Sequence, residues 1–320
     1  MKTITVVTAC FNEEDNVEEV YRQVRAVMES IDGVSYHHLF IDNRSTDGTA
    51  EILRRLAAAD DRVQVILNTR NFGHVRSPYH AFLQAEGDAV IPVVADLQDP
   101  PEMLREFIKH WKEGAKLVAG VKPTAEESGV MFAVRRLYYS TVSRIADVKL
   151  VQNFTGFGLY DRQVVEALRS MDDPYPYGRG LIAEIGYDIV QIPYNQPRRK
   201  RGVTKNNFYS LFDIAMLGIT SHSRVPLRIA TMSGFALSAL SFGVSIVYLL
   251  LKLLFWSRFP FGLAPVLIGV FFFASIQLFF IGLLGEYVGA ILTHVQKRPL
   301  VFERERINFP FKAGDDEPRR

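Results

Sequence analysis

The hydrophobic positions of residues 3–195 follow two alternating spacings. Short apolar runs rich in β-branched residues predict strands, at Ile4–Ala9, His38–Asp42, Val63–Leu67, Ala89–Val94 and Leu117–Gly120. Between these runs, apolar residues recur at helical spacing, first at Val17, Val20, Tyr21, Val24, Val27 and Met28. Further helices are expected to open at Asp47-Gly48-Thr49 and Pro100-Pro101 and to cover Ser77–Ala85. This alternation predicts an α/β domain with a doubly wound, mostly parallel sheet.

A different pattern begins after residue 205. Residues 206–228 combine apolar positions with few charges, as in an amphipathic helix lying along a bilayer. Ile229–Leu251 and Phe261–Gly285 then lack any Asp, Glu, Lys or Arg. As helices, these runs would reach about 35 Å, enough to cross a hydrocarbon core of about 30 Å. The sequence therefore predicts an α/β domain at 1–205, an interfacial segment at 206–228, two transmembrane helices within 229–285 and a tail at 286–320.

Basic residues flank the two apolar runs on one side. Arg198–Arg201 and Lys205 precede them, and Lys297, Arg298, Arg304 and Arg306 follow them. The loop that joins the runs contains only two basic residues, Lys252 and Arg258. By the positive-inside rule, we expect the α/β domain and both termini on the cytoplasmic side of the inner membrane. Because the chain opens directly on a strand-like run, no secretory signal peptide is expected.

Composition excludes several classes of protein. The 320 residues are 48% hydrophobic and 22% charged, and the formal net charge of +2 gives no overall field that would mark a nucleic-acid binder. The single cysteine, Cys10, excludes an intrachain disulfide and a cysteine-based zinc cluster. The two apolar runs exclude a fully soluble protein. Small residues in these runs permit close helix packing and are consistent with a homo-oligomer, at Gly234, Gly243, Gly269 and Gly282.

Polar or acidic segments follow three of the predicted strands, at Ala9–Glu14, Asp42–Asp47 and Ala95–Asp99. In parallel α/β sheets, ligands bind beyond the carboxyl ends of the strands. Asp96 suits a hard divalent cation, which takes one or two carboxylates plus substrate phosphates. Asp99 either shares that site or caps the helix expected at Pro100. Asp42 either accepts hydrogen bonds from a base or ribose or forms an Asx-turn into Ser45-Thr46-Asp47.

Four motifs occur in order, at Thr8–Glu14, Ile41–Thr49, Asn68–Gly73 and Ala95–Glu102. Together with the two apolar runs, they closely resemble family 2 glycosyltransferases with the GT-A fold. Within that family, the chain is similar to the polyprenyl-phosphate glycosyltransferases, such as dolichyl-phosphate mannose synthases and bactoprenol glucosyltransferases. The likeness runs from residue 3 to about 300. It implies inverting transfer of a sugar from a nucleotide sugar, with a UDP-hexose favoured over a GDP-linked one, to a polyprenyl phosphate at the cytoplasmic membrane face.

The resemblance also implies roles for individual residues. Asp96 would be the catalytic carboxylate and would hold Mg²⁺ or Mn²⁺ on the diphosphate together with Gln98. The nucleotide would be held by Ala9, Phe11, Asn12, Glu13 and Asp42. The acceptor phosphate would be held by Arg135, Arg144, Arg201, Thr204 and Lys205. Two alternatives stay open: Arg135 and Arg144 could be solvated residues of an interfacial helix, and Arg198–Arg201 could attract anionic lipid headgroups.

Two positions depart from the family pattern. Val94 stands where the family usually has the first carboxylate of an Asp-x-Asp motif, and Gly156 stands where an acidic residue is usual. A lipid phosphate is already ionised near neutral pH, so it needs little help from a general base. The main task is to neutralise charge on the departing nucleoside diphosphate, which one metal and basic side chains can do.

The two departures nevertheless motivate an alternative function, a degenerate domain that binds nucleotide sugar or lipid and scaffolds a membrane partner. A processive polysaccharide synthase is disfavoured, because neither Trp111 nor Trp256 belongs to a Gln-x-x-Arg-Trp motif.

Overall fold

The computed structural model describes residues 1–122, 151, 153–196, 225–255 and 263–309. These residues divide into two compact units. The sheet unit contains the described residues before 197 together with those from Lys297 onward, and the helical unit contains those between Val225 and Gln296.

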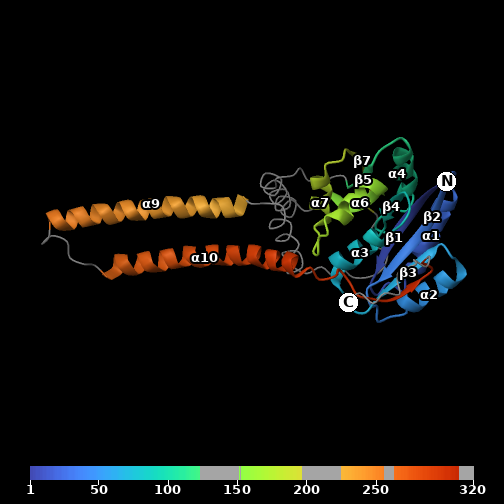
Figure 1. Cartoon of the computed structure of the whole chain (residues 1–320), viewed down its shortest axis with the longest axis horizontal. Coiled ribbons are helices and arrows are strands. Elements are labelled where there is room, and N and C mark those ends of the chain that lie inside the picture. Colours follow the sequence, from blue (N-terminus) through green and yellow to red (C-terminus); the bar gives the residue numbers. More distant parts are fainter. Residues whose placement is uncertain (123–150, 152, 197–224, 256–262, 310–320) are drawn as a thin grey trace. The chain divides into compact units, whose positions relative to one another are not determined.

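The sheet unit is built on an eight-stranded sheet in the order β7-β5-β6-β4-β1-β2-β3-β8 (Figure 1). The central strands β4, β1, β2 and β3 are parallel neighbours, as are β5 and β7. β6 and β8 pair antiparallel with their neighbours. The strands are β1 (Lys2–Cys10), β2 (Val34–Asp42), β3 (Val63–Asn68), β4 (Ala89–Pro92), β5 (Leu117–Val121), β6 (Phe154–Asp161), β7 (Ile189–Pro193) and β8 (Glu303–Ile307). The predicted mostly parallel α/β sheet is confirmed.

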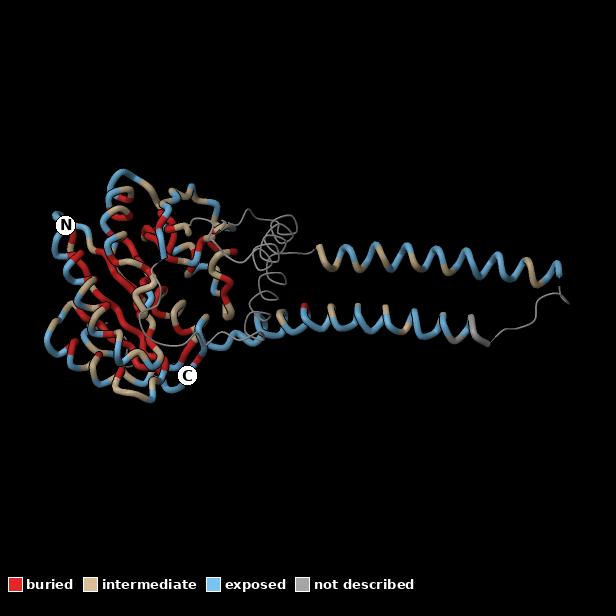
Figure 2. Tube along the Cα trace, turned by 180° about the vertical axis from the view of Figure 1, so that it is seen from behind, coloured by how far each residue is buried: buried red, intermediate tan, exposed pale blue. Residues whose placement is uncertain are grey.

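Helices cover both faces of the sheet, and each face has its own hydrophobic core. Alternate residues of β1 point to opposite faces, so that Val6 packs in one core and Val7 in the other. The first core is completed by α1 (Val17–Glu29), α2 (Thr49–Ala59) and α4 (Met103–Lys112), and the second by α3 (Gly73–Gln84), α6 (Arg162–Ser170) and α7 (Gly178–Ile185). Figure 2 shows the buried segments concentrated along the strands between these layers. The doubly wound arrangement is therefore confirmed as well.

Strand β4 is shorter than its apolar run predicts, because it ends at Pro92 rather than Val94. Pro92 has no N–H to offer a neighbouring strand. Val93 still donates a backbone hydrogen bond to Val7 at 2.8 Å, but Val94 is 43% exposed. The chain therefore leaves the sheet just before Asp96.

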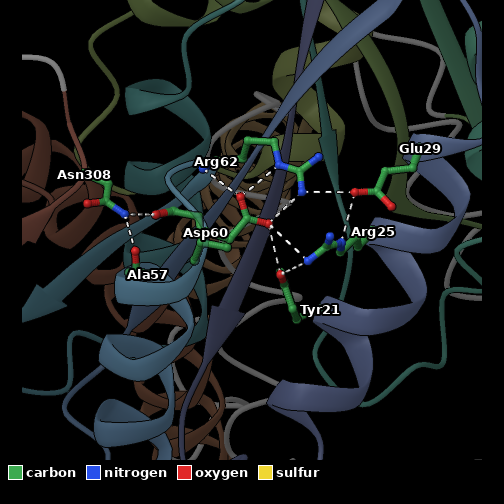
Figure 3. Close-up of polar contacts among 8 residues, drawn as sticks. Tyr21, Arg25, Glu29, Ala57, Asp60, Arg62 and Asn308 are labelled. Carbon is green, nitrogen blue, oxygen red and sulfur yellow. Dashed lines mark hydrogen bonds and ion pairs between the residues drawn. The ribbon is translucent and has the colours of Figure 1, made fainter.

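Strand β8 lies in the segment that the sequence groups with the C-terminal tail, yet it pairs antiparallel with β3 and forms the edge of the sheet. Arg54 on α2 donates to Glu305 at 2.7 Å, and His80 on α3 lies 2.5 Å from Glu303. Beyond the strand, the Asn308 amide donates to the carbonyls of Ala57 and Val63, the first of which is drawn in Figure 3. The chain that leaves the helical unit thus returns to the sheet unit.

A polar network fastens the amino end of β3 (Figure 3). Asp60, which ends α2, accepts from Arg62 at 2.8 Å and from the Tyr21 hydroxyl at 2.9 Å. Arg62 also contacts Glu29 at 3.0 Å. The hydrogen bonds from Arg62 outweigh burial and hold the pKa of Asp60 at about 2. This network therefore holds α1, α2 and β3 together.

The helical unit consists of α9 (Val225–Leu254) and α10 (Leu263–Gln296), which lie alongside each other in Figures 1 and 2. Both are long and apolar enough to cross a membrane. Large apolar side chains such as Phe235 and Phe271 are at least 70% exposed, so neither helix serves as the core of a soluble unit. These features indicate membrane association. Residues 206–224 of the predicted interfacial segment lie outside the described residues, and 225–228 belong to α9.

The glycines singled out for close helix packing make no tight contact with the described part of the chain. A Cβ atom added at Gly234, Gly243, Gly269 or Gly282 would meet no described atom within 4 Å. They do not bring α9 and α10 together at these positions, and the homo-oligomer stays a prediction.

Candidate active site at the carboxyl edge of the sheet

The carboxyl ends of the central parallel strands meet at one edge of the sheet. Cys10 at the end of β1 is in register with Asp42 at the end of β2, and Asp42 is in register with Leu67 of β3. The loops that follow these strands therefore lie together, as the position of the sequence motifs predicts.

The loop after β1 is bound to the segment after β2 by backbone and side-chain hydrogen bonds of the predicted nucleotide-binding residues. Asn12 has a φ of +55°, a left-handed conformation that asparagine tolerates better than most residues. Its side-chain oxygen accepts from the Thr46 N–H at 2.8 Å, and its own N–H donates to the Ser45 hydroxyl at 2.9 Å. The Glu13 N–H donates to the Thr49 hydroxyl at 2.9 Å. These two residues thus fix the loop geometry, whereas Ala9 and Phe11 are half-buried beside them.

Asp42 makes a local side-chain-to-backbone turn like the one the sequence allows, but to Ser45, three residues on, and not two as in an Asx-turn. Its carboxylate is 1% exposed and accepts from the Ser45 N–H at 3.1 Å. The adjacent Asn43 N–H donates to the Cys10 carbonyl at 2.9 Å. The turn orients the loop that carries Ser45 and Thr46, while a role of Asp42 in holding the nucleotide stays a prediction.

Asn43 is a central residue that the sequence reasoning missed. Its amide is 6% exposed and makes four hydrogen bonds to the motif at residues 68–73. The side-chain oxygen accepts from the Phe72 N–H at 2.9 Å and from the Asn68 amide at 3.2 Å. The side-chain nitrogen donates to Asn71 at 2.9 Å and to the Gly73 carbonyl at 3.1 Å. The only signal in the sequence was that asparagines occur in both motifs.

The loop after β4 presents Asp96 and Gln98 at the same edge. Val93 and Ala95 are buried, Val94 is exposed, and Asp96, Leu97 and Gln98 are half-buried. Val94 and Asp96 lie on either side of the buried Ala95 and share the more open side of the loop, whereas the alternation ends at Leu97. The Asp96 carboxylate accepts from the Gln98 N–H at 3.1 Å, across Leu97 at a φ of +58°.

Within the described ranges, no three His, Cys, Asp or Glu side chains are placed so that they could hold a metal ion together. A divalent ion at this edge would therefore have one carboxylate, Asp96, the amide oxygen of Gln98, and oxygens of a bound diphosphate. That donor set fits Mg²⁺ or Mn²⁺, which take hard oxygen ligands and commonly bind through one carboxylate plus substrate phosphates.

Asp99 does not cap α4, so that interpretation is wrong. The helix begins at Met103, its N-terminal capping position is Glu102, and no side chain caps it. Asp99 is 6% exposed, and its carboxylate accepts from the Tyr194 hydroxyl at 3.1 Å. Burial raises the pKa of Asp99 to about 6, although the bond from Tyr194 and the charge of Lys122 oppose this shift. Tyr194 follows β7, which no motif indicated.

Gly156, where the family usually has an acidic residue, has a backbone reason to be glycine. Its φ is +101°, a conformation that residues with a side chain rarely adopt. It lies where the pairing of β6 with β5 is interrupted, and its carbonyl accepts from the Tyr160 hydroxyl at 2.8 Å. The departure is thus tied to the local shape of β6.

The five residues expected to hold the acceptor phosphate lie outside the described residues: Arg135, Arg144, Arg201, Thr204 and Lys205. Their roles stay predictions.

Comparison with known proteins identifies the family. The model of glycosyl transferase family 2 matches residues 5–169. A bactoprenol glucosyl transferase of Shigella phage SfII is 31% identical over 297 residues, which cover 92% of this chain and 96% of the relative. An uncharacterized glycosyltransferase of Synechocystis is 30% identical over 298 residues, which cover 93% of each chain.

Solved structures are more distant. Glucosyl-3-phosphoglycerate synthase from Mycobacterium tuberculosis, in complex with Mn²⁺, UDP and glucosyl-3-phosphoglycerate, aligns with a TM-score of 0.41 and 19% identity, covering 68% of this chain and 78% of that one. This likeness is too remote to carry an inference about ligands. The family match and the full-length relatives do not depend on it, and they show that the chain is a glycosyltransferase of family 2 with a GT-A-like fold.

Proposed function

We propose that this glycosyltransferase transfers a hexose from a nucleotide sugar, with UDP-hexose favoured, to a polyprenyl phosphate at the cytoplasmic face of the inner membrane. The observation that carries the proposal is the extent of the likeness to the bactoprenol glucosyl transferases. It covers 92% of this chain, too much to be confined to the sheet unit and leave out the two membrane-compatible helices. An acceptor that is itself a membrane lipid explains why a nucleotide-sugar enzyme would keep such helices.

The donor would bind at the carboxyl edge of the sheet. Ala9 and Asp42 lie at the ends of β1 and β2, and Phe11, Asn12 and Glu13 lie in the loop after β1. The loops after the two strands are held in one arrangement by the hydrogen bonds of Asn12 and Glu13. Such preorganisation lowers the entropic cost of binding a nucleotide. The diphosphate would extend from there toward Asp96 and Gln98, which would hold a Mg²⁺ or Mn²⁺ ion. When bound, that ion supplies positive charge that stabilises the departing nucleoside diphosphate.

The reaction needs no proton transfer. A phosphate oxygen of the lipid attacks the anomeric carbon as the bond from that carbon to the diphosphate breaks, and the electron pair leaves with the nucleoside diphosphate. Attack opposite the leaving group inverts the anomeric configuration. The chain's task is to orient the two phosphates and to offset their charge. For the acceptor, that task would fall to the predicted Arg135, Arg144, Arg201, Thr204 and Lys205.

The first test is the change Asp96→Asn in the full chain. We expect at least a ~100-fold loss of transfer, the scale seen when a preorganised charge-stabilising group is removed, because the amide cannot offer a charged ligand to the ion. The assay follows a radiolabelled sugar from UDP and GDP donors into undecaprenyl phosphate. Asp61→Asn, an exposed position next to the amino end of β3, is the matched control and should keep full activity. Absence of lipid-linked product from the unmodified chain with every donor would refute the proposal.

The scaffold alternative rests on Val94, and this position offers a second test. Because Val94 and Asp96 share the open side of the loop, Val94→Asp would place a second carboxylate beside the proposed ion. For a working enzyme, we expect the Mn²⁺ concentration at half-maximal rate to fall severalfold. A non-catalytic scaffold would show no turnover in either form, and its cellular phenotype would survive Asp96→Asn.

A further inference from the structure

Three arginines from distant parts of the chain lie near one another where the chain re-enters the sheet unit after α10. Arg70 follows β3, Arg76 lies on α3, and Arg298 comes two residues after Gln296, the last residue of α10. The Arg76 guanidinium donates to the carbonyl of Pro299, the neighbour of Arg298. The Thr69 N–H and hydroxyl donate to the Phe302 carbonyl at 2.9 and 3.1 Å. Residues 69–76 and 298–302 are therefore joined by hydrogen bonds.

Aromatic contacts strengthen this junction. The Arg70 guanidinium lies over the Phe72 ring, 4.2 Å from its centre, and the Phe72 and Phe302 rings lie 6.2 Å apart. Phe72 is itself held by Asn43, because its N–H donates to the side chain of that residue. Arg70 is thus presented by a buried network and is not part of a loosely held surface loop.

The charge of this cluster is not neutralised within the described part of the chain. None of the three arginines forms an ion pair there, and the buried Nε of Arg76 has no hydrogen-bond partner there. Burial and the positive charges of Arg70 and Arg298 lower the pKa of Arg76. Glu303, the first carboxylate of β8, is already engaged by His80 and Arg306. An anion from outside the sheet unit would satisfy both the charge and the unpaired donor.

The cluster is separate from the proposed transfer site. Asp96 follows β4, whereas Arg70 follows β3, and the strand order places β1 and β2 between them. At about 4.8 Å per strand, the two strand ends are about 14 Å apart. Because the reacting acceptor phosphate must lie against the anomeric carbon beside the donor diphosphate, this separation favours a different phosphate as the partner of the arginines.

We propose that Arg70, Arg76 and Arg298 form a second phosphate site that binds the headgroup of an anionic phospholipid. Arg298 follows directly on a helix long enough to span a bilayer, so chain connectivity keeps this residue near the headgroup layer if α10 spans. Guanidinium groups bind phosphate through paired hydrogen bonds. The proposal rests on the membrane placement in the proposed function but not on the identity of the donor or acceptor.

The test uses the full chain in detergent micelles, with phosphatidylglycerol as the anionic probe and phosphatidylcholine as the neutral one. Native mass spectrometry measures the lipid retained. We expect Arg70→Gln, Arg76→Gln and Arg298→Gln each to weaken phosphatidylglycerol retention about fivefold, the equivalent of about 1 kcal/mol per basic residue near anionic lipid. Phosphatidylcholine retention should not change. Added salt should reduce the difference in phosphatidylglycerol retention between the unmodified chain and the variants.

The triple variant has a matched control of equal charge loss, the combined changes Arg22→Gln, Arg55→Gln and Arg105→Gln at exposed helix positions. Equal loss of phosphatidylglycerol in the two triple variants would overturn the proposal, since net charge alone would then explain the binding. If the triple variant at the cluster does not fold, the exposed Arg298→Gln change alone carries the comparison.

A second arm separates phospholipid from acceptor. With undecaprenyl phosphate as substrate in neutral micelles, the cluster variants should keep the KM of the unmodified chain. A several-fold rise in that KM would assign the cluster to the acceptor phosphate and overturn the proposal. If the unmodified chain shows no transfer activity, that result counts against the proposed function, but the measurement of lipid retention stays valid.

Discussion

Asn43 shows how one buried amide can organise loops that have no regular structure. Its four hydrogen bonds join the loop after β2 to the backbone and side chains of residues 68–73. A buried donor or acceptor that loses its partner costs free energy, because water cannot replace the bond. The geometry of the candidate site therefore depends on a residue that need not touch a substrate.

We expect Asn43→Ala to lower the free energy of unfolding by about 3 kcal/mol, because it leaves the Phe72 N–H unpaired and leaves the Asn68 side-chain nitrogen with only its bond to Ser77. Thermal unfolding of the full chain in detergent measures the effect. Asn71→Ala, at an exposed position in the same network, is the matched control and should be clearly milder. Equal unfolding temperatures for the two variants would contradict this role.

Asp99 gives a pH dependence whose sign follows from its burial. Its pKa is about 6 in the folded protein, above the ordinary value of 3.8, so the folded state binds the proton more tightly than the unfolded state. The resulting stabilisation is complete below about pH 4 and is lost as the pH rises through about 6. At pH 7.5, the buried charge costs about 3 kcal/mol.

We expect Asp99→Asn to remove this titration, because the amide can still accept from Tyr194 without carrying charge. Between pH 4.5 and 7.5, the unfolding temperature of the variant should rise relative to that of the unmodified chain. If the unfolding temperatures of the two proteins change in parallel with pH, Asp99 does not titrate in this range.

At the scale of elements, the pairing of β5 with β6 depends on close approach of two backbones. A Cβ atom at Gly158 would lie 2.2 Å from the Val118 carbonyl oxygen and 3.2 Å from the Ala119 Cα. Because both neighbours are backbone atoms of the adjacent strand, no side chain can move aside. The strands would have to separate next to the β6 segment that carries Gly156.

Gly158→Ala should therefore destabilise the sheet unit by at least about 3 kcal/mol and reduce the yield of folded chain. Gly178→Ala at the start of α7 is the matched control, because an added Cβ there meets nothing within 4 Å. Yield from detergent extracts and thermal unfolding compare the two. Similar stability for both variants would show that β5 and β6 tolerate a wider spacing.

The edge strand β8 is an element that its own residues do not predict. Glu303, Arg304, Glu305 and Arg306 form a charged run that reads as a solvated tail. The run becomes a strand because β3 offers an unpaired edge and because Arg54 and His80 provide partners for two of its carboxylates. These partners are more than 200 residues away in the chain, where no local pattern can indicate them.

At the scale of the whole molecule, the proposed cytoplasmic placement of the sheet unit can be tested by cysteine labelling. The native Cys10 is 2% exposed, and burial, followed by the charge of Asp42, raises the pKa of its thiol. A buried, protonated thiol reacts slowly with maleimides. Background labelling of the unmodified chain should therefore be low.

In a chain carrying Glu113→Cys, at an exposed position after α4, we expect a membrane-impermeant maleimide to label spheroplasts only after permeabilisation. In a chain carrying Phe255→Cys, beyond the far end of α9, labelling should occur without permeabilisation, because the positive-inside rule places that end outside. The reverse pattern would invert the proposed topology. Labelling of both positions in intact spheroplasts would show that the helices do not form a transmembrane pair.

The sequence by itself determined the features that arise from short stretches of chain. The spacing of apolar residues located β1 to β5 and the helices between them, and the long apolar runs located α9 and α10, because each pattern depends on the composition and spacing within that segment alone. The ordered motifs also pointed to the edge of the sheet where Asp42 and Asp96 lie, because parallel strands bring their carboxyl ends together.

Only the tertiary structure decided which distant groups meet. Asn43 binds the loop after β3, Tyr194 donates to Asp99, and β8 completes the sheet. The arginines that follow β3 and α10 come together in the same way. The energy of each of these contacts depends on what lies across from the residue, and the sequence around either partner carries no record of that neighbour.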